Sequence, residues 1–399
     1  MMTCISAAAA LSICSAMASA QWTCVRLHPA NAERSFANAA VGTTQAGYAT
    51  FGGVQHGGVW TGSAASWTDL SPAGATMTVV QGCTAGMQVG YAGFPTVAIH
   101  ASVWSGTAAS RVDLHPAGFT QSLAYSVDGP QQVGVVVAGS LSRAALWTGT
   151  AASFVNLHPA GASESRAYGV DNGVQVGSAT IGGAGRAGMW SGTAASWVNL
   201  HPAGFVSSQA LAIENGQQVG SVTIGGESRA ALWTGTAASF VNLHPAGSAY
   251  STAMGVGAGY QVGFASVGGA EHAVLWNSTA SSFLDLHQFA PAPFVFSYAT
   301  GVSSDGTNLY VSGYASNGPS LTEAIVWIRP LPGACDGVDF NHDGLFPDTQ
   351  DVTDFLAVFA GGTCPTESCG DIDFNNDGLF PDTSDIDSLL SVFSGGACV

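Results

Sequence analysis

The chain contains no lysine and few basic residues of any kind. Eight arginines stand against 25 aspartate and glutamate residues, which gives a formal net charge of −17 at pH 7. The acid is concentrated near the C-terminus, where the stretch Gly333–Val399 holds 13 acidic residues and no arginine. A tail of this kind repels nucleic acid and anionic lipid and suits hard cations such as Ca²⁺. We therefore expect no nucleic-acid partner.

Long apolar runs are missing after residue 20. No later segment approaches 18 continuous apolar residues, so the sequence predicts no transmembrane segment. Residues 1–20 themselves have the pattern of a secretory signal, because the apolar stretch 5–17 leads to Ala-Ser-Ala directly before Gln21. We expect a secreted, extracellular protein associated with the cell surface. Removing Cys4 and Cys14 with the signal leaves six cysteines, an even number that suits an oxidising compartment.

Common catalytic signatures are also missing. The chain has no G-x-S-x-G, no H-E-x-x-H and no P-loop. A glycosidase needs a pair of carboxylates, yet the acidic residues before Gly333 are scattered. These observations favour a protein that is not an enzyme. If a catalytic site exists, we expect it in the irregular stretch 289–317, where the repeat described next departs from its pattern.

A sevenfold repeat dominates residues 22–329. The segment Arg143–Gly161 recurs unchanged at Arg229–Gly247, and a tryptophan recurs at intervals of 43 or 44 residues until the last, which is 51. These tryptophans are Trp60, Trp104, Trp147, Trp190, Trp233, Trp276 and Trp327. Each unit reads as four short strands separated by glycine turns; in the fifth unit we expect them at 209–214, 218–224, 229–233 and 239–243. Four strands in 40–50 residues are typical of a propeller blade.

The two ends of the repeat predict how the propeller closes. The last unit runs from its Trp327 strand into Pro330 and Pro332, so it lacks a fourth strand. Residues 22–27 supply an unattached fourth strand at the other end. We therefore expect an all-β seven-bladed propeller over residues 21–332 in which the N-terminal strand completes the last blade and removes open sheet edges. An open β-solenoid is the alternative. The units resemble bacterial extracellular HAF repeats, with a His/Arg-Ala-x-Leu-Trp strand followed by a Val-Gly strand in the next unit.

The residue four positions before each tryptophan is basic in six of the seven units. The set could form a partial cationic ring that holds an anionic ligand such as an acidic glycan. It comprises His56, His100, Arg143, Arg186, Arg229 and His272, with Glu323 in the seventh unit. The alternative is a strand-edge side chain that hydrogen-bonds the neighbouring blade.

A second histidine recurs in the Leu-His-Pro element of the repeat. Ligands to one metal ion must converge within a few ångströms, and outer strands of different blades hold these residues apart. We expect them to pack turns. They are His28, His115, His158, His201, His244 and His287, with Ser71 in the remaining unit.

The tail, residues 333–399, contains two copies of a D-x-N-x-D-G loop, 34 residues apart. Such a loop turns every second side chain inward and places oxygen ligands for Ca²⁺ at positions 1, 3, 5 and 7. The usual closing carboxylate falls on Gln350 and Ser384, which are poor ligands, and an aspartate follows one residue later in each copy; Asp348 and Asp382 could substitute. We predict two Ca²⁺ ions held by Asp339, Asn341, Asp343, Leu345 and Asp351, and by Asp373, Asn375, Asp377, Leu379 and Asp385.

A short amphipathic helix is expected after each loop. Apolar residues fall at i, i+3, i+4 and i+7 from Val352 and again from Ile386, and each helix should end at a Gly-Gly pair. The two apolar faces should pack on each other. Cys335 and Cys364 have the same separation as Cys369 and Cys398, 29 residues, so duplication symmetry predicts these two disulfides. Cys24 and Cys83 remain and could pair with each other.

The tail resembles dockerin domains of the GC type, on the loops, the Phe-Pro-Asp-Thr segments and the Phe-x-Gly-Gly-x-Cys ending. The resemblance implies a small α-helical, EF-hand-like module that binds a cohesin-like surface receptor. Together with the propeller it favours a surface- or scaffold-anchored binding protein whose propeller takes a glycan or protein ligand. The alternatives are a polysaccharide-degrading enzyme delivered by its dockerin and a structural surface-layer component.

Overall fold

The protein divides into two compact units. The computed structural model describes residues 22–95, 97–318, 321–331, 336–345, 348–365, 369–370, 372–375, 382–394 and 398. One unit is Trp22–Arg329, and the chain from Pro330 onward belongs to the other. The division falls close to the expected boundary between residues 332 and 333. The predicted signal, residues 1–20, lies outside the described residues.

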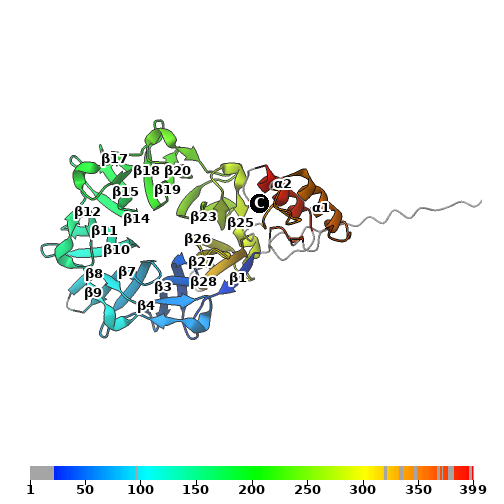
Figure 1. The fold of residues 1–399 in the computed structure, drawn as a ribbon. Helices are drawn as coiled ribbons and strands as arrows, with labels where there is room; N and C mark the ends of the chain where they lie inside the picture. The colour runs from blue at the N-terminus through cyan, green and yellow to red at the C-terminus, as the bar shows by residue number, and fades with distance from the viewer. Residues whose placement is uncertain are drawn as a thin grey trace, which may run out of the picture. The chain divides into compact units, whose positions relative to one another are not determined.

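The first unit is a seven-bladed β-propeller, as the repeat predicts. Each blade is a four-stranded antiparallel sheet, and the first strands of neighbouring blades contact one another around the axis (Figure 1). In chain order the blades are β2 (Arg34–Val41), β3 (Thr44–Phe51), β4 (Val54–Thr61) and β5 (Thr68–Asp69); β6 (Met77–Cys83), β7 (Gln88–Phe94), β8 (Val97–Trp104) and β9 (Val112–Asp113); β10 (Gln121–Asp128), β11 (Gln131–Ala138), β12 (Leu141–Trp147) and β13 (Val155–Asn156); β14 (Ser165–Asp171), β15 (Val174–Ile181), β16 (Ala184–Trp190) and β17 (Val198–Asn199); β18 (Ser207–Glu214), β19 (Gln217–Ile224), β20 (Glu227–Trp233) and β21 (Val241–Asn242); β22 (Ser251–Gly257), β23 (Tyr260–Val267), β24 (Ala270–Trp276) and β25 (Leu284–Asp285); and β26 (Phe296–Ser304), β27 (Asn308–Ser316) and β28 (Thr322–Pro330), with β1 (Thr23–Arg26).

The N-terminal strand closes the ring. β1 pairs antiparallel with β28, with Cys24 opposite Trp327, so the sheet order of blade 7 is β1-β28-β27-β26. The prediction that residues 22–27 complete the last blade is confirmed, and the open solenoid is excluded. All seven repeat tryptophans are fully buried, since each blade presents its third strand to the core between blades.

The Leu-His-Pro histidines fasten each blade to the next, as the turn-packing interpretation predicts. His115 Nδ1 lies 2.9 Å from Ser122 Oγ on the first strand of the following blade, and that oxygen accepts the Ala101 N–H from the preceding blade at 2.9 Å. His115 Nε2 faces the Phe119 carbonyl, an acceptor, so we assign the proton to Nε2. The same histidine–serine contact recurs at His28, His158, His201, His244 and His287.

One blade junction lacks this fastening. Between blades 1 and 2 the histidine is replaced by Ser71 and the serine by Thr78, and both hydroxyls are buried with no hydrogen-bond partner. A Cβ on Gly57 would lie 2.8 Å from the Thr78 γ-methyl, which explains why glycine stands where other blades carry alanine. The three departures from the repeat are therefore coupled.

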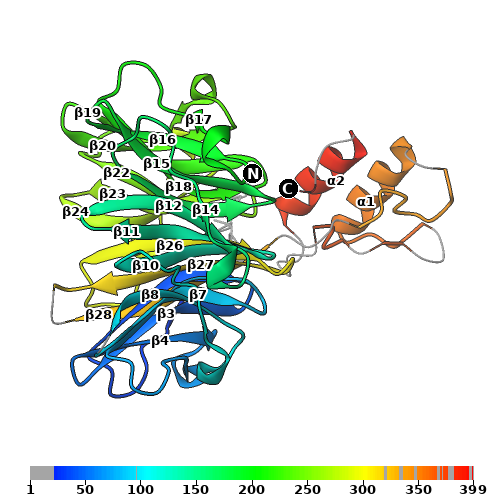
Figure 2. The ribbon, with the colours of Figure 1, turned by 90° about the vertical axis from the view of Figure 1, so that its left-hand side faces the viewer.

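The second unit is built on two helices, α1 (Thr349–Phe359) and α2 (Thr383–Phe393) (Figure 2). Its core is formed by Val338, Phe340, Phe355, Phe374 and Leu389. Gly361 adopts φ +86°, so α1 ends at the expected Gly-Gly pair, where Gly361 and Gly362 donate to carbonyls of the last turn. The buried face of each helix includes fewer apolar residues than predicted, because Leu356 on α1 and Leu390 on α2 are exposed. No helix among the described residues is long and apolar enough to cross a membrane.

The cysteine pairing differs from the prediction. Cys364 bonds to Cys369, with Cα atoms 5.8 Å apart, so the pairs Cys335–Cys364 and Cys369–Cys398 are wrong. Cys398 is disulfide-bonded as well, and Cys335 lies outside the described residues. Cys24 and Cys83 are free, so their suggested pairing is also wrong. Symmetry assumed that each half of the tail closes on itself, whereas this bond joins two cysteines that both lie between α1 and α2 in the sequence.

Candidate functional site: the central channel

Every innermost strand carries a bulge at the same place. In β2 the register with β3 shifts between Ala37 and Ala39, which leaves Asn38 as the extra residue. The other blades shift at the equivalent position. A bulge re-aims a side chain, and bulges are common next to functional sites. The seven bulge residues are Asn38, Gln81, Tyr125, Tyr168, Leu211, Met254 and Thr300, and all of them line the central channel.

A glycine on the second strand makes each bulge possible. A Cβ on Gly47 would lie 1.9 Å from the Phe36 carbonyl oxygen, and the equivalent glycine of each other blade is equally crowded. This explains the Val-Gly element of the repeat, because only glycine permits such a close approach of the two backbones. The bulge residues were not predicted from the sequence. The recurring glycine was the signal that could have located them.

The bulge positions depart from the repeat more than their surroundings do. The channel has a volume of about 350 Å³, and none of its lining residues is charged. Amide and hydroxyl side chains come from blades 7, 1 and 2, tyrosines from blades 3 and 4, and apolar side chains from blades 5 and 6. The fold accepts different side chains at the bulge positions. These side chains can therefore differ from blade to blade in a way that suits a ligand.

Contacts between blades fix the bulge side chains. Asn38 Nδ2 donates to the Val80 carbonyl at 2.8 Å, and Thr300 Oγ1 donates to the Ala37 carbonyl at 2.7 Å. Tyr125 and Tyr168 stack with ring centroids 5.6 Å apart. Burial raises the pKa of Tyr125 to about 12, and burial likewise raises the pKa of the Cys83 thiol to about 12. Both groups therefore stay protonated at neutral pH, and the channel stays uncharged.

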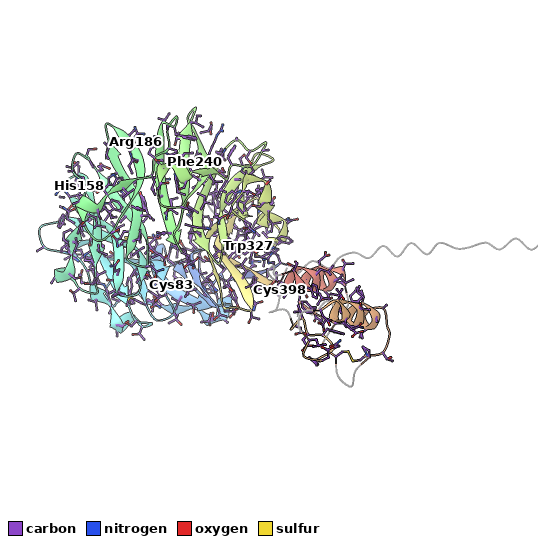
Figure 3. All side chains as sticks on the ribbon, turned by 45° about the horizontal axis from the view of Figure 1, so that its top comes forward. Cys83, His158, Arg186, Phe240, Trp327 and Cys398 are labelled. Carbon is purple, nitrogen blue, oxygen red and sulfur yellow. A yellow bond between two sulfur atoms is a disulfide. The ribbon has the colours of Figure 1, made fainter. Side chains whose placement is uncertain are left out.

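The predicted ligand ring is not brought together at one point. Its residues lie on the third strands of six separate blades, and Figure 3 labels one of them, Arg186. His56 Nδ1 lies 2.7 Å from Asp69 Oδ2 on the fourth strand of its own blade, and His100 and His272 make the same contact with Asp113 and Asp285. The alternative of a bond to the neighbouring blade is therefore wrong for these three histidines. The remaining members, Arg143, Arg186 and Arg229, occupy the matching positions, and Arg186 contacts His201.

The first predicted calcium loop folds onto its own backbone. Asp343 N–H donates to Asp339 Oδ1 and to Asn341 Oδ1, both at 3.1 Å, and Leu345 N–H donates to Asp343 Oδ1 at 2.8 Å. Gly344 adopts φ +78°, which is the sharp turn expected at position 6. In the second loop Asp373 and Asn375 are described, while Asp377 and Leu379 lie outside the described residues.

Asp351 and Asp385 return to their loops from the first turn of the helices. Asp351 is fully buried, and its carboxylate faces the N–H groups of Asn341 at 3.5 Å and Asp348 at 3.2 Å. Asp385 repeats this geometry with Asn375 and Asp382. Burial, reinforced by the charge of Asp373, raises the pKa of Asp385 above its ordinary value.

Two alternative calcium ligands have other roles. Asp348 and Asp382 act as helix N-caps, since their side chains accept the Gln350 and Ser384 N–H groups. Asp348 and Asp382 thus begin the helices, while Asp351 and Asp385 reach the loops. The donor set is oxygen throughout, it includes a buried carboxylate in each half, and the tail has no lysine or arginine, so the residues fit a hard cation.

Comparisons with known proteins bear on the fold. No family model matches the chain, and no curated protein matches it. Among solved structures it is similar to a puromycin hydrolase, at 13% identity and TM-score 0.54 over 74% of this chain and 51% of that one. It is also similar to a puromycin-hydrolyzing peptidase from Mycobacterium tuberculosis, at 15% identity and TM-score 0.52 over 75% of this chain and 52% of that one. The chain thus spans about half the length of these peptidases.

These similarities correct one expectation. The sequence favoured a surface-anchored binding protein, with a polysaccharide-degrading enzyme or a surface-layer component as alternatives. Both of the similar structures named above hydrolyse puromycin, a finding that contradicts the expected function. At this level of identity the likeness itself shows the fold alone.

Proposed function

We propose that this chain acts in peptide hydrolysis, with the propeller admitting an uncharged stretch of peptide to its central channel. The observation that carries the proposal is the channel lining of amide, tyrosine and apolar bulge residues without any charge. A peptide backbone offers donors and acceptors to Asn38 and Gln81, and its apolar side chains suit Leu211 and Met254. The similar solved structures support peptides as the substrate class.

The channel contributes substrate selection in this proposal, and the hydrolysis is that of the full chain. No residue is assigned the bond-breaking step, because the chain spans only half of the similar peptidases. Fixed side chains around a narrow axis favour extended, unfolded segments over folded proteins. The sequence-based interpretation that the chain is not an enzyme is therefore open to direct assay.

Peptide turnover by the full chain tests the proposal. Purified protein is incubated with puromycin and with a library of short peptides, and products are followed by mass spectrometry. Met254→Arg places a charge in the channel, and turnover of neutral peptides should fall at least about tenfold because burying an unpaired charge is costly. Val206→Arg on the exposed surface of blade 5 is the matched control and should leave turnover unchanged. Absence of turnover by the unmodified chain, or equal turnover by both variants, would overturn the proposal.

We also propose that the second unit binds two Ca²⁺ ions. The support is the paired return of Asp351 and Asp385, each fully buried, to the loops. Ca²⁺ titration of the full chain followed by calorimetry should show binding, and the melting of the second unit should rise with Ca²⁺. Asp351→Asn with Asp385→Asn should remove this effect and leave the propeller transition unchanged. A melting temperature of the second unit that does not respond to Ca²⁺ contradicts the proposal.

Export remains part of the proposed function. The Cys364–Cys369 bond supports an oxidising compartment, and the Ala-Ser-Ala pattern before Gln21 supports cleavage of a signal. Expression with the native N-terminus should give an extracellular protein that begins at Gln21. Recovery of the uncleaved chain from the cytoplasm would count against export.

A further inference from the structure

An aromatic cluster replaces the smaller residues of the repeat where blade 7 meets blades 6 and 1. Tyr298 and Tyr314 stack with centroids 4.7 Å apart, Phe36 meets Tyr314 edge-on at 4.9 Å, and Phe264 meets Tyr298 edge-on at 5.2 Å. The equivalent first- and second-strand positions of blades 3 to 5 hold Leu123, Val135, Arg166, Ser178, Gln209 and Ser221. The fold itself does not require aromatic residues here, because the other blades form without them.

A carboxylate lies within this cluster. Glu271 stands on β24, at a repeat position that serine holds in blades 3 and 5. The Tyr250 hydroxyl donates to Glu271 Oε1 at 2.8 Å, and burial together with the charge of Glu271 raises the pKa of Tyr298. None of the ion pairs among the described residues includes Glu271. The Glu271 carboxylate is therefore held by the Tyr250 hydroxyl, and no ion pair among the described residues neutralises its charge.

The cluster borders a cavity of about 250 Å³. Its lining residues are Phe36, Glu271, Phe296, Tyr298, Tyr314, Ser316 and Thr322. This set shares no residue with the lining of the central channel. Burial raises the pKa of Tyr314, and the charge of Glu271 raises it further, so the negative field reaches across the cavity. The phenol hydroxyls remain neutral at physiological pH.

Aromatic rings and a carboxylate around one small cavity select for positive charge on an organic group. Ring faces attract cations through their quadrupole, and they accommodate alkylated ammonium groups that are weakly hydrated. A metal ion would need several oxygen ligands, and the cavity offers a single carboxylate. We propose that this cavity, which we name the Glu271 pocket, binds a small organic cation of the alkylammonium class.

Ligand binding by the full chain tests the pocket. Choline and its uncharged isostere 3,3-dimethylbutan-1-ol are titrated by calorimetry, together with N-acetyl-lysine amide as a primary ammonium. Choline should bind saturably, and the isostere should bind at least about tenfold more weakly because it lacks the charge. The lysine arm shows whether a primary ammonium is accepted as well. These measurements involve no hydrolysis, so their outcome is independent of the proposed peptide turnover.

Two variants and a control separate recognition from stability. Glu271→Gln should weaken choline binding at least about tenfold and leave binding of the isostere unchanged, and Tyr314→Leu should weaken choline binding through loss of a ring face. Glu164→Gln removes a carboxylate at the same edge of blade 4 and should have no effect. Melting temperatures confirm that each variant is folded. Equal binding of choline and the isostere, or choline binding unaffected by Glu271→Gln, would overturn the proposal.

Discussion

Arg26 on β1 and Glu323 on β28 form an ion pair that spans 297 residues of sequence, with Arg26 Nε 2.6 Å from Glu323 Oε2. In the other six blades the base stands on the third strand, and aspartate or asparagine stands on the fourth. In blade 7 the acid, Glu323, stands on the third strand and the base, Arg26, stands on the fourth. The N-terminal strand is therefore matched to the last blade and to no other, which is how a charge pair specifies a partner.

Replacing Arg26 should loosen the closure of the ring. Arg26→Ala leaves Glu323, whose side chain is 4% exposed, without its partner, and we expect a loss of about 2 kcal/mol in the free energy of unfolding. Urea unfolding measures this loss. The double variant Arg26→Asn with Glu323→Arg places the residue types of blade 3, Arg143 on the third strand and Asn156 on the fourth, in blade 7 and should recover most of it. No recovery would show that polarity is unimportant at this position.

Repairing the junction between blades 1 and 2 should stabilise the propeller. Ser71→His with Thr78→Ser restores the hydrogen bonds seen at the other junctions, and each restored bond contributes about 1 kcal/mol.

Gly57→Ala should destabilise the unmodified chain, because its Cβ meets the Thr78 γ-methyl, and it should be tolerated better beside Thr78→Ser. Thermal unfolding of the unmodified chain, of Gly57→Ala, of Thr78→Ser and of the variant that carries both changes completes a double-mutant cycle. Additive effects of Gly57→Ala and Thr78→Ser would contradict the coupling.

Stability should fall as the pH drops below neutral. Burial lowers the pKa of His115, His244 and His287 below the ordinary value of 6.5, and burial together with Arg186 lowers that of His201. The unfolded chain therefore takes up protons first as the pH falls. The contribution of these histidines is complete above about pH 6.5 and is lost progressively below it. Melting temperatures between pH 7.5 and 5 measure the loss, and His115→Gln should reduce the slope.

The Cys364–Cys369 bond can be mapped directly. Trypsin cannot cut the tail, which has neither lysine nor arginine, but Glu367 lies between the two cysteines and offers a Glu-C site. After digestion without reductant, the fragments on either side of Glu367 should remain joined and should separate on reduction. Fragments that separate before reduction would restore the symmetric pairing of Cys335 with Cys364 and Cys369 with Cys398.

The fold could be predicted from the sequence because every blade of the propeller repeats the same pattern of residues. Seven tryptophans at a nearly constant spacing locate the third strands. The single strand at residues 22–27, which precedes the first complete blade, predicts how the ring closes. The bulges were not predicted, because one extra residue such as Asn38 alters the alternation of side chains too briefly to be seen. The bulge residues line the channel. The sequence therefore predicted the architecture of the propeller but not the candidate site.

The remaining errors share a physical cause. The symmetric disulfides were inferred from duplication, yet spacing alone does not determine connectivity. His56 and Arg143 were grouped by charge, whereas His56 contacts Asp69 on the fourth strand of its own blade and blade 3 carries the uncharged Asn156 at the matching position. In the tail, Asp351 was placed near the loop because the expected position 12 held Gln350, and that local reasoning agrees with the geometry.

The ring closure also determines when this protein can become a propeller. Thr23 Oγ1 donates to the Ile328 carbonyl, across 305 residues, so the first strand to be synthesised can pair only after nearly the last has been made. Blades 1 to 6 can form as the chain emerges, since their strands are neighbours in sequence. Blade 7 cannot. Until β28 has formed, β1 has no strand to pair with, and a truncation that removes β26, β27 and β28 leaves an arc of six blades in place of a ring.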